Sequence, residues 1–85
     1  MIESAQIRAA RALLGWRQED LSKAAGIGTA TVRRIESANS TATSYVSTLS
    51  RIQASLEAAG VLFIDDDGSA GIGVRLARTK KKKKR

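Results

Sequence analysis

The segment GIGTATVRRIES, residues 26–37, places small side chains beside two long cations. Thr29 and Ala30 come first, and Arg33 and Arg34 follow one helical turn later. A guanidinium group donates hydrogen bonds to carboxylates, to phosphates and to the edge of guanine. Small residues at the start of a helix would let its backbone enter a duplex major groove of about 12 Å, where the arginines reach bases or phosphates. The pattern therefore indicates a nucleic-acid contact.

A plainer interpretation is a solvated helix face in which Arg33 or Arg34 pairs with Glu36 or Glu19. We favour nucleic acid because small and cationic residues gather in one short segment. Glu36 is assigned a structural role, since a carboxylate facing a phosphate would be repelled.

Other chemistries lack the residues they need. The chain has no cysteine and no histidine, which excludes disulfides, thiolate chemistry and the usual zinc or copper ligand sets. Three contiguous aspartates, 65–67, do not alternate as calcium ligands do, and a turn lacks the buried pocket that acid–base catalysis requires. We expect no catalytic residue, no metal site, no cofactor and no enzymatic activity.

The charge of +7 is concentrated at one end of the 85-residue chain. Residues 80–85 supply six of the fifteen cations, so the preceding 79 residues carry only +1. Binding of a polyanion by that part must come from where the cations are placed. For residues 79–85 we expect a disordered basic tail, and a non-specific DNA clamp, a passive tail and a cloning remnant all remain open.

Hydrophobic spacing and turn residues predict four helices that position the arginines. They cover residues 4–14, 18–25, 29–37 and 44–60, with Ser4 as the first cap. The predicted inward residues include Leu21, Ala24 and Ala25 in the second helix, Val32 and Ile35 in the third, and Val46, Leu49, Ile52, Leu56 and Ala59 in the fourth. A short fifth helix within residues 39–45 is an alternative to a polar loop there.

Two β-like runs, residues 61–64 and 72–76, flank an Asp67-Gly68 turn signal and predict a hairpin. An isolated two-stranded hairpin is marginal in water, and so is a small core made of Ala, Leu, Ile and Val. We therefore expect the hairpin to pack on the helices or to pair with a second subunit. The residues assigned to dimerisation are Val61, Phe63, Val74 and Leu76.

Residues 4–59 resemble the helix-turn-helix domain of the Cro and lambda-repressor type, the XRE family of bacterial and phage regulators. The resemblance rests on Q-x-x-L-x-x-x-A-G-I, which begins at Gln18, and on the T-V-x-R-I-E that follows it. It implies a mainly α, lambda-repressor-like domain of four to five helices. We divide the chain into that domain at 1–60, the hairpin at 61–78 and the tail.

The resemblance also implies which residues meet DNA. Base contacts fall on Thr29, Ala30 and Arg34, with guanine as the expected partner of Arg34. Backbone contacts fall on Arg17, Gln18, Thr31, Arg33, Asn39 and Ser40. Two positions depart from the family pattern, because Arg17 and Gly28 stand where capping Ser or Thr residues are common.

The expected function is sequence-specific binding of double-stranded DNA by a transcriptional regulator. We expect a homodimer, most simply a repressor of its own gene among others, that binds an inverted-repeat operator; the sequence leaves open whether it blocks polymerase or recruits it. We expect the protein in the cytoplasm, at the nucleoid, with no membrane span. One alternative is an antitoxin that binds its own promoter and a toxin partner. A second is a basic peptide that binds RNA or a membrane surface through its lysine tail.

Overall fold

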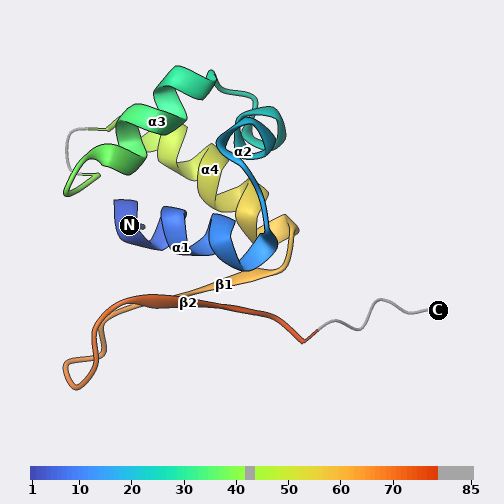
Figure 1. Ribbon diagram of the computed structural model, residues 1–85. Coiled ribbons are helices and arrows are strands. Elements are labelled where there is room, and N and C mark those ends of the chain that lie inside the picture. Colours follow the sequence, from blue (N-terminus) through green and yellow to red (C-terminus); the bar gives the residue numbers. More distant parts are fainter. Residues whose placement is uncertain (42–43, 79–85) are drawn as a thin grey trace.

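The computed structural model describes residues 1–41 and 44–78 of the protein. Figure 1 shows helices packed together above a hairpin. The elements are α1 (Ser4–Leu14), α2 (Gln18–Ala25), α3 (Thr29–Ser37), α4 (Val46–Ala58), β1 (Val61–Ile64) and β2 (Gly73–Leu76). The mainly helical fold with a C-terminal hairpin is confirmed. No fifth helix occurs in the described part of residues 39–45, and the predicted tail, residues 79–85, lies outside the described residues.

The helices end where glycine permits a left-handed backbone. Gly15 and Gly26, directly after α1 and α2, both have φ of 69°, a conformation that costs residues with a Cβ about 1–2 kcal/mol. The predicted cap of α1 was wrong: Glu3 occupies the cap position, and Gln6 Oε1 accepts the Glu3 backbone N–H at 2.8 Å. The fourth helix begins at Val46, two residues later than expected.

The elements form three layers. The helices α1 and α4 lie in the middle, with α2 and α3 packed on one side of them and the hairpin on the other (Figure 1). Within the hairpin, β2 runs beside α1 and β1 beside α4. The helix that carries the two adjacent arginines is therefore separated from the hairpin by a full layer of helix.

A single hydrophobic core joins the layers. Its buried members are Ile2, Ile7, Ala10, Leu21, Ala25, Val32, Ile35, Leu49, Ile52, Leu56 and Val61. The inward positions predicted for α3 are confirmed. Trp16, partly buried, packs against the core. Two other inward predictions are corrected, since Ala24 is exposed and Val46 is 62% exposed.

The hairpin is held to α1 by a buried glutamine. The strands pair antiparallel with Val61 opposite Leu76 and Phe63 opposite Val74. Gln6, 3% exposed, donates from Nε2 to the carbonyl of Ile64 at 3.3 Å and to that of Gly73 at 3.0 Å. Because its Oε1 also accepts a hydrogen bond, this one amide ties the start of α1 to both strands.

Candidate nucleic-acid interface

A tight turn sets the angle between α2 and α3. The carbonyl of Ser22 accepts the N–H groups of Gly26 at 2.9 Å and Ile27 at 3.1 Å, which closes the end of α2. Gly28, in extended conformation, then accepts from Thr31 and Val32 and begins α3 without a side-chain cap. Half-buried Ile27 packs on the core between the two helices. The turn therefore brings α3 across α2 with its arginines outward.

Side chains of α1 hold the C-terminal end of α3 from behind. Ser4 Oγ donates to the carbonyl of Ile35 at 2.7 Å, and Arg8 donates to the carbonyl of Glu36. These carbonyls belong to the last turn of α3, where C=O groups have no hydrogen-bond partners within the helix itself. The Ser4 hydroxyl thus serves α3 instead of capping α1, and α3 is fixed against the middle layer.

Glu36 neutralises Arg11 inside the protein. The Glu36 side chain is 4% exposed and accepts from Arg11 Nε at 2.7 Å and from Nη2 at 2.8 Å. The hydrogen bonds to Glu36 are the main reason that the pKa of Arg11 is raised above its ordinary value, against the opposing effect of burial. The structural role predicted for Glu36 is confirmed. Its carboxylate binds Arg11 of α1 and does not face outward.

The same carboxylate also positions Gln18 at the start of α2. Gln18 Nε2 donates to Glu36 Oε1 at 3.2 Å. An amide nitrogen carries two hydrogens, so one remains for an external acceptor such as a phosphate. Next to it, Arg17 is an exposed residue whose side-chain contact with Asp20 is a loose 3.8 Å.

The arginines of α3 take no part in ion pairs within the described residues, and Glu36, one of their expected partners, pairs with Arg11 instead. With about 100° between successive helical residues, Arg33, Ser37, Ala30 and Arg34 follow one another around a single exposed arc, and all four are exposed. Arg33 lies at the edge nearer Glu36 and Gln18. Arg34 lies at the opposite edge, about 100° away.

The predicted base-contact residues do not all share one edge of this arc. Thr29 is half-buried and lies near Arg33, roughly 140° around the helix from Arg34. Thr31 is also half-buried, on the side of Arg34. Ala30 lies between the two arginines. Because its side chain is small, the middle of the arc projects less than its two edges.

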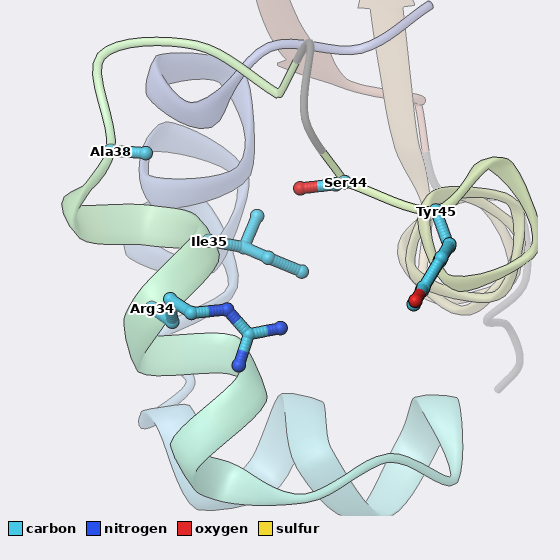
Figure 2. A pocket seen from close by; sticks show the side chains of 5 residues that line it. All are labelled: Arg34, Ile35, Ala38, Ser44 and Tyr45. Carbon is cyan, nitrogen blue, oxygen red and sulfur yellow. The ribbon is translucent and has the colours of Figure 1, made fainter.

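Beyond Arg34, a hollow separates α3 from the start of α4. Its lining is Arg34, Ile35, Ala38, Ser44 and Tyr45. Figure 2 shows the Arg34 and Tyr45 side chains extending into it from opposite sides, with Ile35 between α3 and the hollow. Tyr45 is 81% exposed. The arc is thus flanked by the start of α2 on one side and the start of α4 on the other.

Tyr45 and Ser44 were missed by the sequence analysis, which began the fourth helix at Ser44. An available signal was the only tyrosine of the chain in a polar loop directly before a helix. Asn39 and Ser40, the predicted loop contacts, are exposed just past α3. They lie on the surface but do not line the hollow.

The predicted dimerisation residues have different environments. Val61 is 1% exposed and belongs to the core, which corrects the prediction that its side chain meets a second subunit. Phe63 and Val74 are half-buried against the helices. Leu76 is 46% exposed, and so remains available.

Acidic and apolar clusters elsewhere do not form a competing site. Asp66 and Asp67 accept backbone N–H groups within the turn, from Gly68 and from Ser69 and Ala70. In residues 1–41 and 44–78 no group of three or more His, Cys, Asp or Glu side chains could hold a metal ion. Nor does any helix in those ranges have the length and apolar character needed to cross a membrane.

Comparison with known protein families matches the helical part of the chain. Residues 7–52, just over half of the chain, match the model of a protein family described as helix-turn-helix. The matched range runs from the middle of α1 to the middle of α4 and contains the whole exposed arc. A search of curated proteins found no match.

Proposed function

Because the chain belongs to the XRE, or lambda-repressor-type, helix-turn-helix family of DNA-binding transcription regulators, we propose that it is a homodimeric repressor that reads an inverted-repeat operator with α3. The observation that carries this proposal is the exposed arc of α3. Two arginines that form no ion pair with any other described residue flank an alanine there, while the carboxylate of Glu36, on the same helix, is turned inward onto Arg11.

The arc is suited to a major groove because its centre is low and its edges are cationic. Ala30 lets the helix approach closely and would touch a thymine methyl group. Arg34 is the residue we assign to base reading, with guanine O6 and N7 as acceptors. Thr29, half-buried at the other edge, contributes less, and Arg33 beside it contacts phosphate.

Two helix starts would grip the phosphates on either side of the groove. Arg17 and Gln18 lie on the Arg33 side, where Glu36 holds the Gln18 amide in place. Tyr45 and Ser44 lie on the Arg34 side, across the hollow. Thr31, Asn39 and Ser40 supply further backbone contacts near the ends of α3. Phosphate contacts of this kind fix the register of the protein on the duplex without reading its sequence.

Repression follows from occupancy of the operator. A dimer would place two copies of α3 in successive major grooves, about 34 Å apart, and so cover DNA that polymerase needs. The proposal includes no cofactor and no enzymatic step, and it places the protein at the nucleoid. Regulation of its own gene is the first case to examine.

Selection from random duplex DNA tests the proposal. Purified full-length protein is incubated with a random pool at fixed salt, and bound sequences are amplified and read. We expect an enriched inverted repeat with half-sites about one helical turn apart, and protection of a matching site upstream of the gene in a footprint. A pool that remains random after repeated rounds, with binding that depends only on salt, would contradict sequence-specific recognition.

A further inference from the structure

The hairpin presents a β-strand edge that no described residue covers. The sheet has two strands, so β2 pairs with β1 on one edge only. Ala77, directly after β2, donates its N–H to the carbonyl of Gly60 at 2.7 Å. Backbone groups alternate in direction along an antiparallel ladder. The N–H and C=O groups of Leu76, Val74 and Ile72 therefore point away from β1, towards the open edge.

Apolar side chains accompany this edge. A shallow hollow between α1 and β2 is lined by Ala5, Gln6, Ala9, Ile72, Gly73 and Val74. Ile72 is 44% exposed and Leu76 is 46% exposed, while Ala5 and Ala9 are exposed on α1. Unpaired strand edges readily take up another strand, and the small alanines leave room for a second helix beside α1.

We propose that β2 pairs antiparallel, edge to edge, with β2 of a second copy of this chain, so that two hairpins form one four-stranded sheet. This inference rests on the proposed function, because it supplies the dimer that an inverted repeat requires. The occupant of the edge is the same segment of the same protein. Four strands also relieve the marginal stability of an isolated pair.

The layered fold selects edge pairing over packing of the outer sheet faces. The twofold axis of an edge-paired sheet runs through the sheet, so both sets of helices stay on the same side of it. Because α3 lies beyond the α1 and α4 layer from the hairpin (Figure 1), both recognition helices then stay on that side too. Packing of the outer faces, which carry Leu62 and Ile64, would turn the two copies of α3 in opposite directions.

The requirement that both sets of helices lie on one side of the sheet also limits which residues of the two β2 strands can lie opposite each other. Residues directly opposite each other share a sheet face, so helices on one side require partners of equal parity, such as Val74 with Val74. In a register centred on Val74, Ile72 of each copy lies opposite Leu76 of the other copy. Both of these apolar pairs lie beside α1. It uses the backbone groups that point outward, and it places Arg75 opposite Gly73. A register centred on Arg75 would instead oppose two like charges, which is destabilising.

Charge along the hairpin agrees with an antiparallel arrangement. Residues 65–67 make the turn end acidic, and Arg75 and Arg78 make the other end basic. Antiparallel pairing brings the acidic end of one hairpin towards the basic end of the other, and does so at both ends of the interface. A parallel arrangement would bring like charges together at both ends.

Single cysteines test the register directly, because the natural chain has none. In an antiparallel hydrogen-bonded pair the Cα atoms are about 5.5 Å apart, within the range of about 4.4–6.8 Å that a disulfide tolerates. We expect full-length Val74→Cys to form a covalent dimer under mild oxidation. Ile72→Cys and Leu76→Cys should crosslink efficiently only when mixed. Leu62→Cys, on the outer face of β1, is the matched control and should stay uncrosslinked.

A second variant removes the pairing without adding charge. Val74→Pro deletes an N–H that points to the open edge and leaves the β1 side of the ladder intact. We expect this variant to have the circular dichroism spectrum of the natural chain. In sedimentation equilibrium it should be a monomer at concentrations where the natural chain is a dimer. A monomeric natural chain, or crosslinking of Leu62→Cys in place of Val74→Cys, would overturn the proposed interface.

The two proposals fail separately in these measurements. If the natural chain lacks the edge interface but still selects a specific DNA sequence, the strand pairing alone is overturned. A dimer with the predicted crosslinks that selects no DNA sequence would support the pairing and refute the proposed repressor.

Discussion

Replacing Glu36 by glutamine examines the contact on which the position of α3 depends. The carboxylate accepts two hydrogen bonds from Arg11 and one from Gln18 while only 4% of its side chain is exposed. Glutamine has nearly the same shape but no charge, and its amide group can turn only one oxygen towards these three donors. The variant therefore leaves the guanidinium of Arg11 partly unpaired.

The expected loss of stability follows from burial. Removing one partner of a buried ion pair costs about 3–5 kcal/mol. The Arg11 side chain is 20% exposed, so water recovers part of its solvation, and we expect about 2–3 kcal/mol for Glu36→Gln. A chain of this size has a total stability of roughly 4–13 kcal/mol. The expected fall in Tm is about 10–20 °C.

Urea denaturation followed by circular dichroism measures this loss. Arg17→Ala is the control, because its ion pair with Asp20 is exposed and 3.8 Å long, worth about 1 kcal/mol at most. The double variant Arg11→Met/Glu36→Met should recover much of the stability lost in Glu36→Gln, since no buried charge is left unpaired. A loss for Glu36→Gln no larger than that of the control would refute the buried-pair reasoning.

Further expectations concern the interface and the turns. Arg17→Ala should weaken DNA binding alike on all sequences and reduce the log–log salt slope by about 0.9 in titrations at several salt concentrations. Tyr45→Ala should leave Tm nearly unchanged but lower DNA affinity, and equal affinities of Tyr45→Phe and the natural chain would rule out a hydroxyl contact. Gly26→Ala should cost about 1–2 kcal/mol from its positive φ alone, because an added Cβ meets only Arg51 Nη1 at 3.7 Å. In a carbon-detected NMR titration, the pKa of Asp67 should lie below the usual aspartate value, because the Ala70 and Ser69 N–H groups favour its charged form; the stabilisation of the turn is then present above the ordinary pKa and lost as the pH falls through the lowered one.

Local rules account for most of the fold. The limits of α1 and α2 could be predicted from hydrophobic spacing and from glycines that take a left-handed conformation directly after each helix. The hairpin turn was marked by Asp67-Gly68, and Gly68 indeed has φ of 87°. These features depend on neighbours in the sequence, which is why the sequence alone reveals them.

Long-range polar contacts escaped the sequence analysis. The bond of Ser4 to Ile35 spans 31 residues, and that of Gln6 to Gly73 spans 67. Each of these side chains has a plausible local role at the start of a helix, so the sequence offers no reason to prefer a distant partner. The burial of Val61 was missed for the same reason, since alternation predicts two faces of a strand but not which residues the helices cover.

Within the candidate site, residue types were easier to predict than their arrangement. The exposure of Ala30, Arg33 and Arg34 is confirmed by the structure. The distance of Thr29 from Arg34 around the helix follows from helical geometry but was not used. Tyr45 could not be found from the motif, because it lies after a loop and only the fold places it across the hollow from Arg34.

The most direct test of the account compares Arg34→Ala with Arg33→Ala on the selected operator, on single-base variants of it and on random DNA, at one salt concentration. The account predicts that Arg34→Ala loses about 1–3 kcal/mol on the operator and no longer discriminates at one base pair. Arg33→Ala should weaken binding to every duplex alike. Equal losses on operator and random DNA for Arg34→Ala would contradict base reading by this arginine.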